Sequence, residues 1–192
     1  MPIYWPLKYW KTADRERAID HINALRKLIA RTVPGRTATD TLLLATWNVR
    51  DFDSDKFGQG PRLAESLHYI AEVVSAFDLV AMQEVNEDMR PFEKVMNLLG
   101  PAWRYVATDV TEGPSGNGER MVFLFDETKV QFKHIAGEIV LPKSSLVGGE
   151  HQFARSPFLV RFQSGWFKFN LCTVHMYYGD DSGDGYARRV AE

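Results

Sequence analysis

The sequence lacks the features that mark several large classes of protein. It has one cysteine, Cys172, so no disulfide can form within the chain, which is typical of a reducing compartment. It has no run of about 18 apolar residues, the length that a membrane-spanning helix needs. Residues 1–10 have neither the charged start nor the apolar stretch of a signal peptide. These absences predict a cytoplasmic protein that does not insert into a membrane.

A strong excess of charge of one sign is also absent. The 192 residues carry 23 lysines and arginines against 25 aspartates and glutamates, which gives a formal net charge of −2. This balance neither requires nor excludes a polyanionic partner, because attraction to phosphate can be local. Hydrophobic residues make up 45% of the chain, enough for one domain with a sizeable core.

Two common ligand-binding motifs are incomplete. The alternate aspartates of residues 51–55 resemble a calcium loop, but its sixth position is Lys56 and its twelfth is Arg62. Glycine and glutamate are needed at those two positions. Gly58 and Gly60 precede a predicted helix without the third glycine of a dinucleotide-binding fingerprint. A dedicated calcium site and a nucleotide-cofactor enzyme are therefore disfavoured.

The first part of the chain predicts a helix. In residues 12–32, Ala18, Ile22, Leu25 and Ile29 recur at helical spacing, so residues 1–40 are assigned to an N-terminal helical extension. Residues 41–192 then form the main domain. The helix carries an excess of arginine and lysine that could contact a phosphate backbone. The solvated face of a packed helix is the simpler interpretation.

A strand–helix–strand unit opens the main domain. The apolar runs at residues 41–48 and 78–84 predict strands that are buried on both faces, with a helix that begins at Pro61 between them. Such a unit gives parallel strands joined by a right-handed crossover. A helix near residues 91–99 follows. Further strands with hairpin-like connections are predicted at residues 103–110, 120–125, 130–135, 158–162 and 167–174.

Polar residues stand at the ends of these strands: Asn48, Glu84, Glu119 and His175. The ends of buried strands are where α/β proteins build sites, because the sheet fixes the positions and the loops leave room for a ligand. An amide, carboxylates and an imidazole suit a hard metal ion and a phosphate better than acyl or hydride chemistry. Taken singly, each residue also fits a turn, a salt bridge or a structural role.

Each candidate residue has an expected role. Glu84 would bind a metal, because a carboxylate at the end of a buried strand needs a compensating cation, and Mg²⁺ prefers one or two carboxylates with waters and phosphate oxygens. Asn48 would hold that ligand or a phosphate oxygen. Glu119 would orient His175, which could donate to a phosphoryl oxygen or transfer a proton. The planar guanidinium of Arg155 suits a phosphate, although a surface arginine before a strand is an equal alternative.

Together these segments resemble the endonuclease/exonuclease/phosphatase superfamily, the metal-dependent phosphoesterases that include DNase I-like nucleases and inositol polyphosphate phosphatases. The resemblance runs from about Thr41 to the end of the chain and leaves residues 1–40 uncovered. Five matching segments occur in the family's order: Thr46-Trp47-Asn48-Val49, Gln83-Glu84, Gly118-Glu119-Arg120, Arg155-Ser156-Pro157 and Thr173-Val174-His175.

The resemblance implies an α/β fold, the DNase I-like four-layer α/β sandwich, in which two packed β-sheets are flanked by helices. It implies Mg²⁺, with Mn²⁺ as the alternative, at Glu84 and Asn48. It also implies a catalytic His175 oriented by Glu119, and a phosphate contact from Arg155. The family's later Asp-x-Asn and Asp-His motifs are missing from the 192 residues. We therefore expect the N-terminal part of such an enzyme, truncated at its C-terminus, without a general base and inactive by itself.

The function expected of the complete protein is metal-dependent phosphoester hydrolysis, with a nuclease favoured. The reason is that the basic helix at residues 12–32 and the loop at residues 109–118 could flank a groove for nucleic acid. A phosphatase that acts on a small molecule or a lipid is the first alternative. A non-catalytic binding module on the same scaffold is the second. Retention of the four strand-end polar residues speaks against this second alternative, because a scaffold needs none of them.

Overall fold

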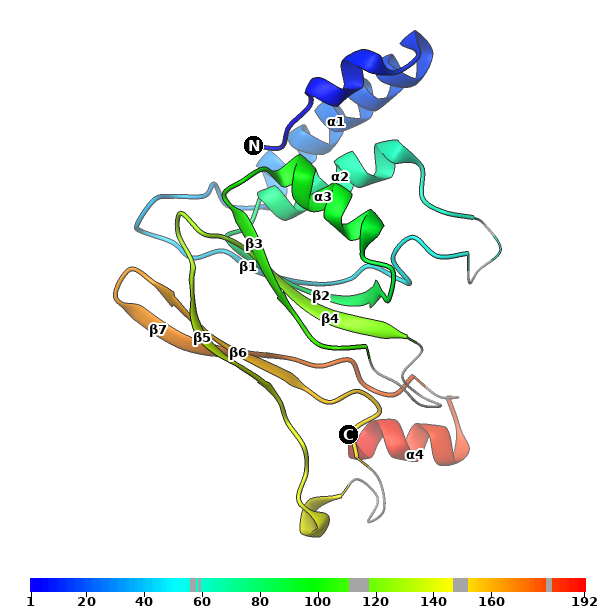
Figure 1. Ribbon diagram of the computed structural model, residues 1–192, viewed down its shortest axis with the longest axis vertical. Coiled ribbons are helices and arrows are strands. Elements are labelled where there is room, and N and C mark those ends of the chain that lie inside the picture. The colour runs from blue at the N-terminus through cyan, green and yellow to red at the C-terminus, as the bar shows by residue number, and fades with distance from the viewer. Residues whose placement is uncertain (56–57, 59, 111–117, 147–151, 179–180) are drawn as a thin grey trace.

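Two β-sheets packed face to face form the body of the computed structural model, which describes residues 1–55, 58, 60–110, 118–146, 152–178 and 181–192 (Figure 1). Lys56 and most of the loop at residues 109–118 therefore lie outside the described residues. The first sheet has the order β1-β2-β4-β3, and its strands are β1 (Leu44–Asn48), β2 (Leu79–Asn86), β3 (Trp103–Ala107) and β4 (Glu119–Asp126). The second has the order β5-β6-β7, with β5 (Gln131–Glu138), β6 (Phe158–Ser164) and β7 (Phe167–Thr173).

The helices are α1 (Thr12–Thr32), α2 (Ala64–Ser75), α3 (Arg90–Leu99) and α4 (Gly183–Ala191), with short 3₁₀ turns η1 (Trp5–Tyr9) and η2 (Lys143–Ser145). Strands β1 and β2 run parallel, with Leu44 opposite Leu79 and Asn48 opposite Gln83. Helix α2 connects these two strands, so the strand–helix–strand unit predicted from the sequence is confirmed. The other neighbouring strands pair antiparallel.

The first sheet is apolar on both faces, because one face packs on helices and the other on the second sheet. Its side chains Met82 and Leu124 belong to the core beneath α2 and α3. On the other face, the rings of Phe123 and Phe125 lie 5.6 and 5.4 Å from the ring of Phe162 in β6. The central strands β2 and β4 are therefore buried on both sides and read as continuous apolar runs.

The prediction that residues 41–48 are buried on both faces is wrong. Strand β1 is an edge strand, with β2 as its partner among the described residues, and its side chains alternate between exposed and half-buried. Leu44 is 43% exposed. An apolar run cannot tell a central strand from an edge strand, because the tertiary fold decides how many neighbours the strand has.

The helix predicted to begin at Pro61 begins at Ala64 instead. The segment before it is tied to the loop after β1. The backbone N–H of Arg62 donates to the side chain of Asp53, and the Arg62 guanidinium donates to the carbonyl oxygen of Val49 at 2.5 Å. These tertiary hydrogen bonds replace the first helical turn that proline alone would favour.

Helix α1 packs on α2 through ion pairs. Arg17 lies 2.9 Å from Glu65, and Arg26 donates to both carboxylate oxygens of Glu72 at 2.9 and 3.1 Å. In Figure 1, α1 lies at the opposite end of the molecule from α4. These contacts favour the packed-helix interpretation of the basic residues, while the boundary at residue 40 remains a prediction. No helix in the described part of the chain is long and apolar enough to cross a membrane.

A buried histidine of α2 lies against the aromatic residues of the N-terminal segment. His68 of α2 is 3% exposed, and its ring lies 6.3 Å from the ring of Tyr4 and 5.4 Å from that of Trp10. Its Nδ1 atom has no hydrogen-bond partner among the described residues. Burial lowers the pKa of His68 below its ordinary value of 6.5, because the imidazolium ion loses its hydration.

The lowered pKa of His68 has a testable consequence for stability. Below about pH 6.5 the unfolded chain binds a proton at His68 that the folded chain resists, so the free energy of unfolding falls as the pH drops. We expect His68→Phe, which keeps a ring between Tyr4 and Trp10, to remove this part of the dependence. Urea unfolding of the wild type and of His68→Phe at about pH 7.5 and about pH 5.5 checks this prediction. If the free energy of unfolding falls equally in both proteins between the two pH values, the prediction is contradicted.

Candidate active site

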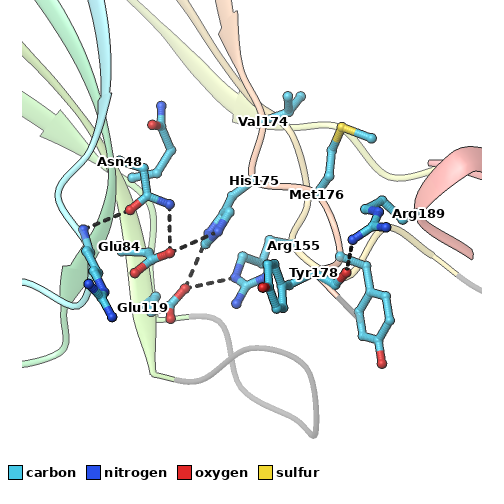
Figure 2. Close-up of a pocket in the computed structure, with 12 residues that line it drawn as sticks. Asn48, Glu84, Glu119, Arg155, Val174, His175, Met176, Tyr178 and Arg189 are labelled. Carbon is cyan, nitrogen blue, oxygen red and sulfur yellow. Dashed lines mark hydrogen bonds and ion pairs between the residues drawn. The ribbon is translucent and has the colours of Figure 1, made fainter. Parts of the chain in front are cut away.

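The five polar residues singled out in the sequence line one cleft at the ends of the two sheets (Figure 2). The cleft has a volume of about 930 Å³. Strands β1, β2 and β4 of the first sheet supply three of these five residues, and the segments beside β6 and β7 supply the other two. The five residues, in chain order, are Asn48, Glu84, Glu119, Arg155 and His175.

Asn48 and the backbone amide of Asp51 hold the carboxylate of Glu84. Asn48 ends β1, and its Nδ2 donates to Oε1 of Glu84 at 2.7 Å. Its Oδ1 accepts the backbone N–H of Arg50 at 2.8 Å. The other carboxylate oxygen, Oε2, accepts the backbone N–H of Asp51 at 2.7 Å. The Glu84 carboxylate is therefore fixed through both of its oxygens before any ligand binds.

The sequence predicted that Glu84 ends its strand. This is wrong, because β2 continues to Asn86. It lies instead at a bulge, where the register with β4 shifts between Met82 and Val85. Its backbone φ angle is +60°, a value that residues other than glycine rarely adopt and that costs about 1–3 kcal/mol. A bulge re-aims a side chain within a strand, and the Glu84 carboxylate is turned to the cleft, where it is 17% exposed.

Glu119 contacts the two residues that come from the segments beside β6 and β7. It is the first residue of β4 and is 3% exposed. The Nε of Arg155 donates to Oε2 of Glu119 at 3.0 Å, and Nδ1 of His175 lies 3.3 Å from the same oxygen. The other ring nitrogen of His175, Nε2, lies 3.3 Å from Oε1 of Glu84. The imidazole therefore stands between two carboxylates and joins all five side chains into one cluster (Figure 2).

Glu119 is expected to orient His175, but the contact between them is longer than a hydrogen bond that would do so. The two side chains are adjacent, but Nδ1 of His175 is buried and has no hydrogen-bond partner in the described part of the chain. A distance of 3.3 Å is longer than that of an ordinary N–H···O bond. Arg155 makes the shorter bond to the same oxygen. Arg155 therefore takes part in holding Glu119, a role that the sequence did not indicate.

Glu84 is the more accessible of the two carboxylates in the cluster. It is 17% exposed, against 3% for Glu119. Within the described residues, no group of three or more His, Cys, Asp or Glu side chains is gathered to hold a metal ion. A cation in this cleft would depend on Glu84, with waters or ligand oxygens at most of its positions, which is the arrangement that Mg²⁺ tolerates. The neighbouring imidazole and guanidinium suit an anion.

Sequence reasoning missed a polar contact that ties the two sheets together beneath the cluster. The Nε2 of Gln83 donates to Oγ1 of Thr173 in β7 at 2.7 Å and to Oγ1 of Thr46 in β1 at 3.0 Å. Gln83 and Thr173 are 6% and 5% exposed. A glutamine within a buried apolar run is itself a signal, because a buried amide needs a partner. The partner could not be identified from the sequence.

One wall of the cleft is apolar, which was also not predicted. Its residues occupy alternate positions after β7: Val174, Met176 and Tyr178, which are 50%, 44% and 83% exposed. From α4, Arg189 donates through Nη1 to the carbonyl oxygen of Tyr178 at 2.7 Å. Figure 2 shows these side chains on the far side of His175 from Asn48. The cleft therefore combines a polar cluster with an apolar and aromatic wall.

No protein-family profile and no curated protein matches the sequence. Solved structures do match the fold. A conserved protein of unknown function from Enterococcus faecalis V583 is 19% identical, with a TM-score of 0.51 over 70% of this chain and 52% of that one. ANGEL2, described as a 2′,3′-cyclic phosphatase, is 12% identical, with a TM-score of 0.50 over 78% of this chain and 44% of that one. The endonuclease/exonuclease/phosphatase from Bacteroides vulgatus is 13% identical, with a TM-score of 0.44 over 64% of this chain and 46% of that one.

The chain thus spans about half the length of the structures that it matches. At these sequence identities the likeness concerns the fold alone. It confirms the fold class predicted from the sequence, with two sheets and flanking helices of the DNase I-like type. The roles of the five cluster residues remain predictions.

Proposed function

We propose that this chain, which has the DNase I-like fold of the endonuclease/exonuclease/phosphatase superfamily, carries the phosphoester site of a metal-dependent hydrolase. The observation that carries the proposal is the placement of His175 3.3 Å from both Glu84 and Glu119, with Arg155 paired to Glu119 at 3.0 Å. Glu84, a carboxylate that could bind a cation, thus lies beside His175 and Arg155, whose imidazole and guanidinium could bind an anion. ANGEL2, of similar fold, is described as a 2′,3′-cyclic phosphatase, which supports this class of reaction.

The residues present fit a hard divalent cation, Mg²⁺ or Mn²⁺. Mg²⁺ is usually bound by one or two carboxylates and keeps several waters beside substrate oxygens. Glu84 would hold the ion, and Asn48 would fix that carboxylate or add its amide oxygen. The cleft of about 930 Å³ leaves room for waters and a phosphate. When bound, the cation would neutralise the phosphate charge and polarise its oxygens.

The other residues of the cluster would act on the phosphate directly or hold those that do. Arg155 would bind a phosphate oxygen, since its planar fork matches that geometry. His175 would stabilise the charge that develops on the phosphoryl group or transfer a proton. Glu119 would position both. We assign no general base among these five residues.

A nucleic acid or nucleotide is the substrate that we favour, although not for the reason that the sequence gave. The basic helix α1 packs on α2 and supplies no residue to the cleft. The support comes from the apolar wall of Val174, Met176 and Tyr178. A nucleobase can stack on an aromatic ring beside a bound phosphate, whereas an inositol phosphate is polar all round. A lipid phosphate would use the same wall and is the alternative.

An assay on the intact protein tests the proposal. It compares single-stranded RNA, plasmid DNA, a phospholipid and inositol phosphates as substrates, each with Mg²⁺ and with EDTA. We expect EDTA-sensitive cleavage of the nucleic acids. Cleavage of only the inositol phosphates or the lipid would overturn the substrate preference. Hydrolysis of none of them would favour a non-catalytic binding module.

Replacing Glu119 with glutamine is expected to lower kcat by about 10- to 100-fold, the scale of residues that orient a catalytic group. The substitution keeps the shape but removes the charge that Arg155 and His175 share at Oε2. Glu127→Gln is the matched control, because Glu127 pairs with the exposed Arg104 at 2.9 Å away from the cleft. Unchanged steady-state kinetics of Glu119→Gln would make Glu119 an ordinary strand-end carboxylate.

A further inference from the structure

We propose that Glu192 is a positioning residue that sets the spacing of Arg155 and His175, an inference that rests on the proposed function of those two residues. The side chain of Glu192 is 1% exposed. Each of its carboxylate oxygens accepts a backbone N–H from a different segment. Oε1 accepts the N–H of Ala154 at 2.9 Å, and Oε2 accepts the N–H of Tyr177 at 2.7 Å. These two amides are next to Arg155 and two residues after His175.

The carboxylate acts where the sheet no longer fixes the two segments. The ladder between β6 and β7 has Phe158 opposite Thr173 as its final pair on this side. Arg155 precedes that pair and His175 follows it, so both lie beyond the last rung. Within the described residues, the Glu192 side chain bridges the two backbones at that point. It therefore extends the connection between the strands to the level of the cluster.

The last turn of α4 supports this bridge. Nε of Arg188 lies 3.3 Å from Oε1 of Glu192, and its guanidinium lies 4.6 Å from the centre of the Tyr177 ring. Arg189 donates to the carbonyl oxygen of Tyr178 at 2.7 Å. A buried carboxylate is tolerated when hydrogen bonds and a cation compensate it, and Glu192 has two amides and a guanidinium. These contacts join α4 to the segment that carries His175.

Glu192 is not among the residues that line the cleft, so it acts through the segments that it joins. Arg155 and His175 would contact the same phosphate, and a displacement of about 1 Å in such a pair can cost about 100-fold in rate. An exposed ion pair could not set that distance, because its side chains move freely. A buried carboxylate bonded to both backbones can.

Two variants of the intact protein test the inference. Glu192→Gln keeps the volume, but its amide oxygen can accept only one of the two N–H groups while its NH₂ faces the other. Glu192→Ala removes both acceptors. We expect kcat for phosphodiester hydrolysis to fall by about 10- to 100-fold in Glu192→Gln and further in Glu192→Ala. Glu138→Gln, an exposed position of β5, is the control and is expected to match the wild type.

A spectroscopic readout separates positioning from stability. The Nε–H of Arg155, bonded to the buried Glu119, should give its own signal in a ¹H–¹⁵N spectrum recorded without substrate. We expect this signal to shift toward that of exposed arginines in Glu192→Gln. If Glu192→Ala does not fold, Glu192→Gln decides. A lower melting temperature with an unchanged Arg155 signal and unchanged kcat would overturn the inference. If the wild type hydrolyses no phosphoester, the proposed function fails, while the Arg155 signal still decides the role of Glu192.

Discussion

Replacing His175 with alanine is expected to lower kcat for phosphoester hydrolysis by about 10²–10⁴-fold, the usual contribution of a general acid–base group. The imidazole is the one side chain of the cluster that contacts both carboxylates, at 3.3 Å from each. KM should change much less than kcat, because Arg155 and the bound cation would still hold the phosphate.

The control for the His175 variant is His21→Ala. His21 is exposed on α1, contacts Tyr69 of α2 at 3.0 Å and does not line the cleft. Steady-state kinetics on a dinucleotide and a circular dichroism spectrum of each protein give the comparison. A folded His175→Ala protein whose kcat stays within about threefold of the wild type would contradict the assigned role, because general acid–base groups contribute far more than that.

Replacing Glu84 with glutamine is expected to remove the response to metal and to lower kcat by roughly 100-fold or more, since a bound cation supplies several kcal/mol of charge stabilisation. The glutamine oxygen can still accept from Asn48. Its NH₂ would face the backbone N–H of Asp51, which now donates to a carboxylate oxygen at 2.7 Å. The variant therefore loses the negative charge and one of the hydrogen bonds that fix the side chain.

Mn²⁺ binding, followed by electron paramagnetic resonance, measures the same substitution without substrate. The wild type should show bound Mn²⁺ and Glu84→Gln should show little at the same concentration. Glu93→Gln is the matched control, because Glu93 lies on α3 and does not line the cleft. Equal Mn²⁺ binding by wild type and Glu84→Gln would place the metal elsewhere or exclude it from this cleft.

The sequence was sufficient for the elements that local patterns define. Long apolar runs predicted where β2 and β4 lie in the sequence, because strands buried on both faces have no polar side. Helical spacing gave α1 over residues 12–32. Polar residues at the ends of apolar runs gave four members of the cluster, and the segment Arg155-Ser156-Pro157 before β6 gave the fifth. Their adjacency follows from the parallel pair β1–β2 and from the packing of the second sheet on the first.

The remaining features depend on tertiary contacts that no local pattern encodes. The bulge at Glu84 arises from a register shift against β4, which lies far along the chain. The pairing of Arg155 with Glu119 joins residues 36 positions apart, so an arginine expected to bind phosphate is also held by a buried carboxylate. Glu192 was missed for the same reason. Its partners Tyr177 and Ala154 are 15 and 38 positions away, and a glutamate at a helix end carries no signal of burial.

The most direct test of the central claim is the rate at which the intact protein hydrolyses a phosphodiester before EDTA, after EDTA, and after EDTA is replaced by excess Mg²⁺. If Glu84 holds the cation beside His175, EDTA should abolish hydrolysis and Mg²⁺ should restore it in the wild type. Glu84→Gln should stay near the metal-free rate throughout. Hydrolysis that persists in EDTA, or that Mg²⁺ restores equally in Glu84→Gln, would contradict the assignment of this cleft as a metal-dependent phosphoesterase site.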